Sequence, residues 1–367
     1  MTARARQAAD DRDPASLLGR IDARLAVTPR DAGRPWIVGV SGGPDSVCMA
    51  HAVRRLQPRR KLILAHVDHQ LQPESAQAAD LVVALGRTLA TEVRVVQEDV
   101  AGHARRRRVG IELAARERRY AALADIAHSV GARTVLTGHT RDDHVESILM
   151  HLLRGAGVDG LIGIRVRQQL SGFAGLSGTT GLLLRPLLDV TRAETRGYCD
   201  ERGLAWFSDA TNLDPSFDRN RVRMHLLPLL RTYNPRFDDA LVRLAELVGD
   251  EAAVVGRAAE RSATRVVCAP IDSTSVRLRR SALLRAPRAL ARRIVRNALT
   301  RVTGSSQELP MALTDQVMAL ARAGASRPRR LTGGLVVHCD AESITIRAET
   351  ADCPTRDHEP GSEPLAR

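Results

Sequence analysis

Short apolar runs alternate with helical patterns over the first half of the chain, and this alternation restricts the fold more than any other feature. The runs that predict strands are Trp36–Val40, Lys61–Asp68, Glu92–Val100 and Arg133–His139. The helical patterns between and after them are Val47–Arg55, Ser75–Ala90, Ile111–Val130 and the stretch DDHVESILMHLLRGAG. Parallel strands need a crossover connection, which is usually a helix. The alternation therefore predicts an α/β fold with a doubly wound, mainly parallel sheet.

The rest of the chain predicts a smaller, mainly helical domain with a terminal β-hairpin. The pattern turns helical near Tyr233–Pro235, and LTGGLVVHCDAESITIRA predicts the hairpin, with Asp340–Ser343 near its turn. The Gly/Ser-rich stretch 165–183 predicts a flexible surface loop. The predicted segments are a flexible leader at 1–33 with a short amphipathic helix, an α/β domain at 34–232, the mainly helical domain at 233–349 and a disordered tail at 350–367.

Composition narrows the functional classes. The net charge of +13 suits a polyanionic partner, above all nucleic acid, although an Arg-rich composition alone would give the same charge. Five scattered cysteines make a disulfide framework or zinc site unexpected and fit a reducing cytoplasm. No apolar run approaches the roughly 20 residues of a membrane span, and no secretory signal is visible at the N-terminus.

The stretch SGGPDS lies between the first predicted strand and its helix. Gly42 and Gly43 allow backbone N–H groups to approach an anion, and Ser41 and Ser46 add hydroxyl donors. The N-terminus of the predicted helix that follows adds a partial positive charge. The carboxylate of Asp45 would repel a phosphate but can hold Mg²⁺. The stretch lacks the lysine of a Walker A loop, and the alternative interpretation is an ordinary strand–helix turn.

SGGPDS resembles the PP-loop of the ATP-pyrophosphatase superfamily. Members of that superfamily cleave ATP between the α and β phosphates, and the loop grips the departing pyrophosphate. The resemblance implies that residues 34–232 form an ATP-binding catalytic domain and that Ser41, Gly42, Gly43, Pro44, Asp45 and Ser46 contact the nucleotide. It also implies Mg²⁺, with Asp45 as its ligand.

Later stretches resemble the tRNA(Ile)-lysidine synthase family within that superfamily. They occur in the family's order, and with SGGPDS the resemblance covers most of residues 36–345. The matching stretches are IELAARERRY, GHTRDDHVESILMHLLRGAGVDGL, RPLL, WFSDATNLDPSFDRNRVRMHLLPLL and RLTGGLVV.

That resemblance implies a ligase that joins L-lysine to C2 of cytidine 34 in the CAU anticodon of tRNA(Ile). The cytidine is adenylated first, with loss of pyrophosphate, and lysine then displaces AMP, which changes the codon and amino-acid specificity of the tRNA. The implied cofactors are ATP and Mg²⁺, and the partners are tRNA(Ile) and free L-lysine. No membrane is expected, the location is cytoplasmic, and a homodimer is an assembly that the sequence leaves open.

Asp143 and Glu146 are three residues apart, so they share one face of a predicted helix. His139 stands just before that helix, beside Gly138. A carboxylate pair can receive an ammonium group and accept its proton. The family resemblance implies that lysine binds at His139, Asp143 and Glu146, and that Gly138 and His139 approach the nucleotide. The alternative is an acidic first turn that complements the helix dipole. His144 stands where the family has Gln.

Two arginines lie on one face of another predicted helix. Arginine suits a phosphate whose charge grows in the transition state, and the resemblance implies that Arg116 stabilises adenylylation. Arg119 and Arg154 are expected to contact substrate, and the run Arg105–Arg108 is expected to contact the tRNA backbone. The alternative for Arg116, Arg119 and the run Arg105–Arg108 is a solvated basic face, and the alternative for Arg154 is that it holds the loop.

Further candidates follow the second predicted strand or lie in the later matching stretches. His66 and Asp68 follow the second predicted strand, where adenine and ribose bind in this fold, but Gln72 departs from the family's Arg. Arg219, Arg221 and Arg223 are expected to approach tRNA phosphates, and Asp209 and Asn212 have either a structural or a substrate role. An arginine-rich face at residues 279–296 predicts a further tRNA-binding surface, and the alternative is a packed helix with a solvated basic outer face.

Two rival functions stay open. A tRNA thiolase would use paired cysteines or an iron–sulfur cluster, and Cys48 and Cys199 have no partner at motif spacing. A catalytically inactive nucleotide-sensing or RNA-binding protein would not need Asp143, Glu146 and Arg116. ATP–pyrophosphate exchange would distinguish the last rival from an enzyme.

Overall fold

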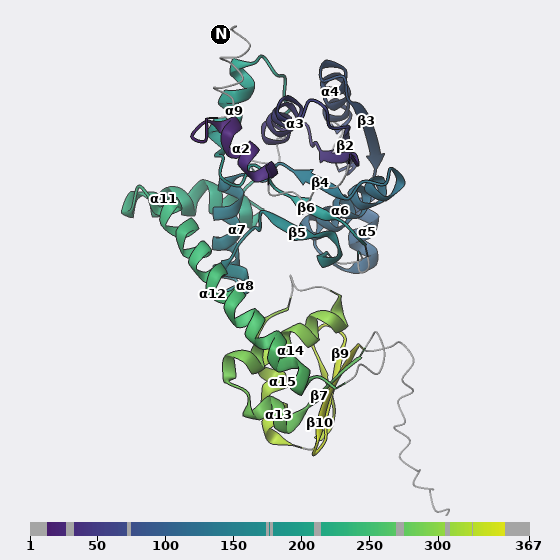
Figure 1. The fold of residues 1–367 in the computed structure, drawn as a ribbon, viewed down its shortest axis with the longest axis vertical. Helices are drawn as coiled ribbons and strands as arrows, with labels where there is room; N and C mark the ends of the chain where they lie inside the picture. Colours follow the sequence, from purple (N-terminus) through teal and green to yellow (C-terminus); the bar gives the residue numbers. More distant parts are fainter. Residues whose placement is uncertain are drawn as a thin grey trace, which may run out of the picture. The chain divides into compact units, whose positions relative to one another are not determined.

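The computed structural model describes residues 13–26, 33–71, 75–173, 176, 179–208, 214–268, 275–304, 309–324 and 326–348. The chain divides into two compact units (Figure 1). The first comprises Met1–Val254 with Gly304–Met311, and the second comprises Val255–Thr303 with Ala312–Arg367.

A mainly parallel sheet organises the first unit. Its strands within the described residues are β1 (Trp36–Gly39), β2 (Leu62–Asp68), β3 (Glu92–Gln97), β4 (Thr134–Thr137), β5 (Arg167–Gln169) and β6 (Leu182–Leu184). They are ordered β3-β2-β1-β4-β6-β5, and every neighbouring pair is parallel except β5 with β6. The predicted doubly wound, mainly parallel sheet is confirmed.

Helices connect and cover these strands. Within the described residues the helices of this unit are α2 (Leu17–Ala26), α3 (Pro44–Leu56), α4 (Ser75–Thr88), α5 (Val100–Arg107), α6 (Ile111–Ser129), α7 (Arg141–Leu153), α8 (Val158–Leu161), α9 (Arg192–Glu201), α10 (Asp218–Arg221) and α11 (Leu227–Tyr233). A short 3₁₀ helix, η1, spans Leu170–Gly172, and a π-helix, η3, spans Val222–Leu226 between α10 and α11. The long helix α12, Phe237–Val266, continues across the division between the two units.

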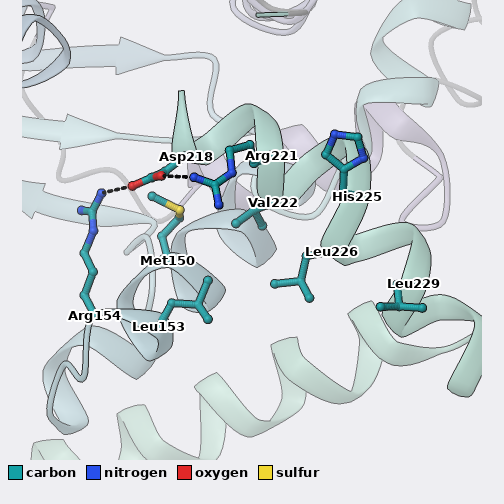
Figure 2. Close-up of a pocket in the computed structure, with 9 residues that line it drawn as sticks. All are labelled: Met150, Leu153, Arg154, Asp218, Arg221, Val222, His225, Leu226 and Leu229. Atoms are coloured by element: carbon teal, nitrogen blue, oxygen red, sulfur yellow. Dashed lines mark hydrogen bonds and ion pairs between the residues drawn. The ribbon is translucent and has the colours of Figure 1, made fainter. Parts of the chain in front are cut away.

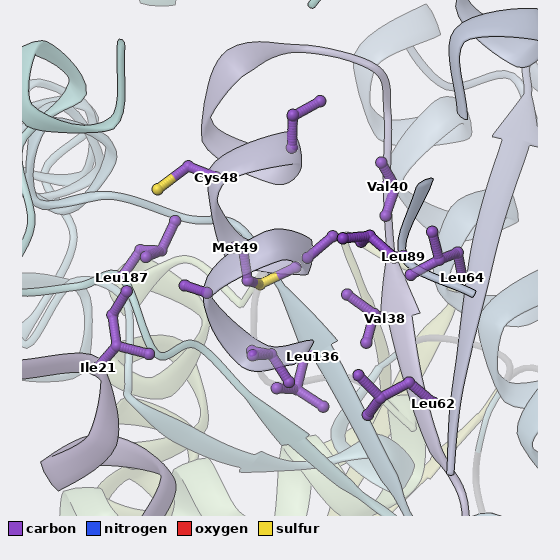
Figure 3. Close-up of a cluster of buried hydrophobic side chains, with 14 of the residues drawn as sticks. Ile21, Val38, Val40, Cys48, Met49, Leu62, Leu64, Leu89, Leu136 and Leu187 are labelled. Carbon is purple, nitrogen blue, oxygen red and sulfur yellow. The ribbon is translucent and has the colours of Figure 1, made fainter. Parts of the chain in front are cut away.

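Strands β1, β2, β4 and β6 are buried on both faces, which explains why they are mostly apolar runs, whereas the edge strands β3 and β5 are partly exposed. Successive side chains of a strand point to opposite faces. Val38 and Leu64 pack with α3 on one face (Figure 3), while Ile37 and Ile63 pack with α6 on the other. The sheet is therefore a rigid platform between two helical layers.

The short amphipathic helix expected near the start of the chain is α2. Leu18, Ile21 and Leu25 are buried in the core that includes α3. The guanidinium of Arg24 donates to Asp189 Oδ1 at 2.8 Å. This helix, which the sequence assigns to a leader, is thus part of the packed unit.

The expectation of a surface loop at residues 165–183 is wrong for much of that stretch. Residues 167–169 form an edge strand, β5, that pairs with β6. Leu170 and Phe173 are buried against the sheet. Because Gly and Ser residues separate these apolar residues, the sequence shows no regular apolar pattern that would predict their burial.

The second unit combines a small sheet with helices. Strands β7 (Ser275–Arg279), β8 (Ser326–Leu331), β9 (Leu335–Cys339) and β10 (Ser343–Ala348) form an antiparallel sheet of order β7-β10-β9-β8. Its helices within the described residues are the C-terminal part of α12, α13 (Arg280–Arg285), α14 (Arg288–Thr303) and α15 (Met311–Ala323). The expected hairpin is β9–β10, and the side chain of Asp340 accepts hydrogen bonds from the backbone of Glu342 and Ser343 in its turn. The hairpin is thus part of a larger sheet.

The predicted domain limits remain a prediction. The compact units divide between Val254 and Val255, inside α12, whereas the sequence pattern changes near residue 233. The tail predicted from residue 350 lies outside the described residues. Among the described helices, none is both long enough and apolar enough to cross a membrane.

Candidate active site at the carboxyl ends of the parallel strands

The sheet order places a crevice beside β1. Strand β1 pairs with β2 on one side and with β4 on the other, so the connections leave in opposite directions. Ligands of doubly wound folds bind at such a switch point, beyond the carboxyl ends of the strands. The loop Ser41–Ser46 follows β1, and Gly138–Thr140 follows β4, so both flank this crevice.

The two loops approach each other closely because residue 138 is glycine. A Cβ atom at Gly138 would lie 3.1 Å from Ser46 Cα and 3.2 Å from the backbone oxygen of Asp45. Gly42 has φ of +90°, a conformation that side-chain-bearing residues rarely adopt. These two glycines therefore set the path of the loop.

The loop presents an uncapped helix N-terminus. Ser46 Oγ accepts a hydrogen bond from Ser41 N at 3.1 Å and donates to Gly43 O at 2.9 Å. Gly43 is the N-cap of α3, and no side chain caps that helix end. Backbone N–H groups and the helix dipole at such an end favour an anion.

Asp45 stands at the start of α3 with two partners. Thr195 Oγ1 of α9 donates to Asp45 Oδ1, and Asp45 Oδ2 lies 3.7 Å from Arg192 Nε. Burial raises the pKa of Asp45 to about 6, and the charges of Asp143 and Asp142 act in the same direction.

The expected carboxylate pair lies on α7 across the crevice. Asp143 Oδ2 accepts from the backbone N–H of Thr140 at 2.8 Å in a capping box, which leaves Oδ1 directed away from the helix end. The side chain of Glu146 is only 1% exposed. Asp143 and Glu146 therefore lie together, as their spacing predicts, and His139 lies between the end of β4 and the start of α7.

Three arginines already neutralise this pair. Arg192 donates to Asp143 Oδ1 at 2.8 Å and to Glu146 Oε1 at 3.1 Å. Arg219 donates to the same two carboxylates at 3.0 and 2.8 Å. Arg223 holds Glu146 with two hydrogen bonds of 2.7 and 3.1 Å. Arg219 and Arg223, expected to face tRNA phosphates, thus contact the carboxylates.

These contacts keep both carboxylates ionised. Burial raises the pKa of Asp143, but the charges of Arg219 and Arg192 outweigh that effect and lower it. Burial likewise raises the pKa of Glu146, but the hydrogen bond from Arg223 and the charges of Arg219 and Arg192 lower it.

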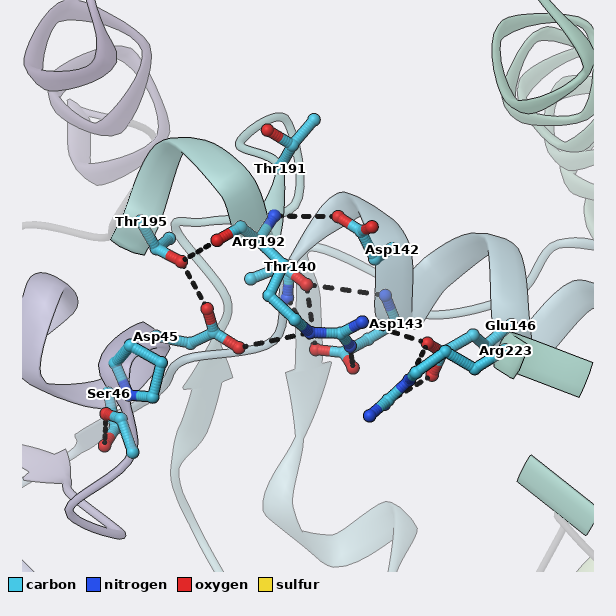
Figure 4. Close-up of polar contacts among 12 residues, drawn as sticks. Asp45, Ser46, Thr140, Asp142, Asp143, Glu146, Thr191, Arg192, Thr195 and Arg223 are labelled. Atoms are coloured by element: carbon cyan, nitrogen blue, oxygen red, sulfur yellow. Dashed lines mark hydrogen bonds and ion pairs between the residues drawn. The ribbon is translucent and has the colours of Figure 1, made fainter. Parts of the chain in front are cut away.

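Arg192 is the residue that the sequence analysis missed. It begins α9, directly after the capping residue Thr191. Figure 4 shows its guanidinium between Asp45 on one side and Asp143 and Glu146 on the other. A cation in the first turn of a helix opposes the helix dipole. That unfavourable position was the available signal of a tertiary role.

A second group of arginines surrounds Tyr120. The guanidinium carbons of Arg116 and Arg119, both on α6, lie 5.3 Å from the centre of the Tyr120 ring. Tyr120 stacks on Phe173 with ring centres 4.0 Å apart. Burial raises the pKa of Tyr120, but the charges of Arg116, Arg185 and Arg119 lower it to about 8.

The positive charges of this arginine group are not balanced by carboxylates within the described part of the chain. No carboxylate there forms an ion pair with Arg116, Arg119 or Arg185. The Nε atoms of Arg119 and Arg185 are buried without a hydrogen-bond partner. Buried donors of this kind fit an anionic ligand with oxygen acceptors.

His139 lies next to the arginine group. Its Nδ1 is 3.0 Å from Thr137 Oγ1. Burial and the charges of Arg185, Arg119 and Arg116 hold the pKa of His139 well below its usual range, so the imidazole is neutral.

His66 and Asp68 occupy the end of β2, the neighbouring strand. His66 Nδ1 donates to Val40 O at 2.9 Å, and Asp68 Oδ1 accepts from Gln70 N at 2.9 Å. Both residues are buried and locally fixed. Gln72, Asp209 and Asn212 lie outside the described residues.

Arg154 and Arg221 lie at a different place. They line an open pocket of about 600 Å³ with Asp218, which is 4.0 Å from Arg154 and 3.2 Å from Arg221 (Figure 2). The other lining residues are Met150, Leu153, Val222, His225, Leu226 and Leu229. Arg154 follows the C-terminal end of α7, roughly 16 Å along the helix from Asp143.

Comparison with known proteins places these residues in a family. A family model described as a PP-loop domain matches residues 20–230. The tRNA(Ile)-lysidine synthase of Salinispora arenicola is 42% identical over 246 residues, which are 66% of this chain and 70% of that protein. The chain belongs to the tRNA(Ile)-lysidine synthase family.

In two other family members, the part that matches this chain is only a fraction of the relative's length. The synthase of Symbiobacterium thermophilum is 38% identical over 79% of this chain and 60% of its own length. The synthase of Thermus thermophilus is 38% identical over 85% and 56% respectively. The matched part thus spans less than two thirds of the length of each of these two relatives. Among solved structures, a U34-tRNA thiolase from Methanococcus maripaludis covers 63% of this chain and 78% of its own, with a TM-score of 0.47 and 16% identity.

The PP-loop domain of this family binds ATP, and the donor set beside the loop fits an accompanying Mg²⁺. Mg²⁺ is usually held by one or two carboxylates together with phosphate oxygens and water. Asp45 Oδ2 is the carboxylate oxygen at the loop that Thr195 does not occupy. No group of three or more ligating side chains exists among the described residues, so the nucleotide would supply the remaining ligands.

Proposed function

We propose that this chain ligates L-lysine to C2 of cytidine 34 in the CAU anticodon of tRNA(Ile), in a reaction driven by ATP. The observation that carries this proposal is the placement of an uncapped anion-binding loop and an ionised carboxylate pair on opposite sides of one crevice, in a member of this family. The first suits a pyrophosphate, and the second suits the ammonium group of lysine.

In the first half-reaction, O2 of the cytidine attacks the α-phosphate of ATP. The new O2–P bond forms as the bond to the bridging oxygen breaks, and pyrophosphate leaves. Residues Ser41–Ser46 and the N-terminus of α3 hold the departing phosphates, with Asp45 as the Mg²⁺ ligand. Bound Mg²⁺ would supply charge neutralisation of the phosphates. Gly138 lets the second loop approach the nucleotide, and His66, Asp68 and His139 line its remaining side.

Arg116 stabilises the charge that develops on the α-phosphate. Its support is the arginine group around Tyr120, which has no acidic partner in the described residues and holds unused buried donors. Arg119 assists it. A preorganised cation in a partly dry site acts without reorganisation at the moment of reaction.

In the second half-reaction, the ε-ammonium of lysine loses a proton and its nitrogen attacks C2. The C2–O2 bond breaks, AMP leaves with that oxygen, and the nitrogen loses a second proton. Asp143 and Glu146 receive the ammonium group, and an ionised carboxylate accepts the first proton. The product base is lysidine, which alters codon reading and the amino acid that the tRNA accepts.

The tRNA contacts are assigned to basic surfaces outside the crevice. Arg154 and Arg221 border an open pocket of the first unit, and Arg105–Arg108 are exposed. Arg285 and Arg288 are exposed in the second unit. A cytoplasmic location follows from the tRNA substrate.

A sulfur-transfer function has less support. Burial raises the pKa of Cys199 to about 11 and raises the pKa of Cys48 further, so both thiols stay protonated at neutral pH. Sulfur chemistry uses the thiolate.

The test is incorporation of radiolabelled lysine into unmodified tRNA(Ile) with a CAU anticodon. Label should enter only with ATP and Mg²⁺, and not when C34 is replaced. A folded, ATP-binding protein that incorporates no label would overturn the proposed function.

A further inference from the structure

Arg192 is shared by the two halves of the crevice. Its Nε lies 3.7 Å from Asp45 Oδ2, and its terminal nitrogens donate to Asp143 at 2.8 Å and to Glu146 at 3.1 Å. The side chain of Arg192 is 16% exposed, so water screens its ion pairs with the three carboxylates only weakly. One guanidinium therefore contacts both the carboxylate pair and Asp45 of the loop Ser41–Ser46, here called the pyrophosphate loop (Figure 4).

The backbone of Arg192 is fixed while its side chain has a choice of partners. Its N–H donates to Asp142 Oδ2 at 2.8 Å, and the Thr191–Glu194 capping box holds the start of α9. The guanidinium can therefore shift between carboxylates without moving the helix.

The other two arginines have no such choice among the described residues. Among the carboxylates of the described residues, Arg223 contacts only Glu146, to which it donates two hydrogen bonds. Arg219 contacts only Asp143 and Glu146. Displacing either one would leave a half-buried guanidinium, 37% exposed in Arg219 and 27% in Arg223, without a carboxylate partner, which is unfavourable. Displacing Arg192 from the pair leaves it with Asp45.

The carboxylate pair has no unused oxygen for an incoming ammonium. Both oxygens of Glu146 and Oδ1 of Asp143 accept from arginines, and Asp143 Oδ2 accepts from Thr140. Three guanidinium groups already match the three carboxylates Asp45, Asp143 and Glu146 in charge. A lysine ammonium can bind only if one arginine gives up its contacts.

We propose that Arg192 is a displaceable counter-ion: it occupies the ammonium position at Asp143 and Glu146 and withdraws to Asp45 when lysine binds. This inference rests on the proposed function, in which lysine binds at that pair. Arg192 is then a positioning residue that makes lysine binding depend on the state of Asp45, at the pyrophosphate loop.

The test measures binding of L-lysine and of n-pentylamine to the full chain without ATP or tRNA. The amine carries the ammonium group but no carboxylate. In Arg192→Gln the competing cation is absent, so the Kd of both ligands should fall by about tenfold, the effect of one charge-assisted contact. Arg192→Lys restores a cation and should return both Kd values toward wild type.

The matched control is Arg196→Gln on the same helix. Arg196 is exposed, and its guanidinium carbon lies 5.9 Å from the centre of the Trp206 ring. This variant should bind both ligands as the wild type does. Melting curves of all three variants establish that differences in Kd do not arise from unfolding.

Two outcomes would overturn the proposed role of Arg192. If Arg192 instead bound the carboxylate of lysine, Arg192→Gln would weaken lysine binding and leave n-pentylamine unchanged, which would overturn the inference. Asp45→Asn supplies a second arm: it removes the alternative partner, so lysine binding should weaken more in the wild type than in the Arg192→Gln background. Equal weakening in both would also overturn it.

Failure of the proposed function has a different signature. In that case the wild type would incorporate no lysine into tRNA(Ile), whatever the variants bind. A wild type that incorporates lysine, but whose Arg192→Gln variant binds it no more tightly, would reject the displaceable counter-ion alone.

Discussion

A Cβ atom at Gly138 would lie 3.2 Å from the backbone oxygen of Asp45, so the turn after β4 rests directly on the loop after β1. Both loops border the crevice in which the candidate site lies. The contact joins two loops whose residues are far apart in the chain but are brought together by adjacent parallel strands.

Gly138→Ala should weaken ATP binding by about tenfold, because the new methyl group pushes the pyrophosphate loop from its position. The measurement is the Kd of ATP by calorimetry. Gly256→Ala is the control, since a Cβ atom there meets nothing within 4 Å. An unchanged ATP Kd in Gly138→Ala would show that the loop does not bind the nucleotide.

Arg116→Gln should reduce tRNA-dependent ATP–pyrophosphate exchange by about 10²–10³-fold, the usual effect of removing a preorganised charge donor. Its melting temperature should not fall, because the substitution removes a half-buried cation that has no acidic partner in the described residues. Arg118→Gln on the same helix is the control; Arg118 pairs with Glu98 at 2.6 Å. Comparable losses of exchange in both variants would argue against the assigned role.

Tyr120 should ionise with a pKa of about 8, measured as the tyrosinate absorbance lost in Tyr120→Phe. Arg116→Gln should raise that pKa toward the ordinary value of about 10, since the charge of Arg116 contributes most to lowering it. A folded-state pKa below the unfolded value stabilises the fold. That contribution is complete above about pH 10 and is lost as pH falls through about 8. A Tyr120 pKa at its ordinary value would contradict the close approach of Arg116 and Arg119 to the Tyr120 ring.

Asp143→Asn should abolish lysine transfer while some adenylylation of tRNA(Ile) continues. The amide oxygen can still cap α7, but the charge that receives the ammonium is gone. Labelled AMP on the tRNA and labelled lysine on the tRNA are measured in parallel. Asp125→Asn, at an exposed position of α6, is the control for charge removal. Loss of ATP binding alone would mean that the lysine pocket is placed wrongly.

The sequence predicted most of the elements that form the crevice. Strands β1, β2 and β4 are apolar runs buried on both faces, and such runs are visible without a structure. Strands β5 and β6 were not predicted, because each has only three residues and they flank Gly/Ser-rich sequence. Their order in the sheet depends on tertiary packing.

The candidate site was predictable only where its residues are local. Asp143 and Glu146 share a helical face, so their proximity follows from spacing. Arg192 reaches Glu146 across 46 residues of sequence, and Arg219 and Arg223 across more than 70. Nothing in local periodicity pairs such residues, which is why Arg192 was missed and the other two were assigned to phosphates.

The most direct measurement of the two-step account is a chase experiment. The protein would be incubated with tRNA(Ile) and ATP without lysine, freed of ATP, and then given radiolabelled lysine. The account predicts that label enters C34 in this ATP-free second step, from an adenylated tRNA made in the first. Label that enters only when ATP is supplied again with lysine would contradict an adenylated intermediate held at this site.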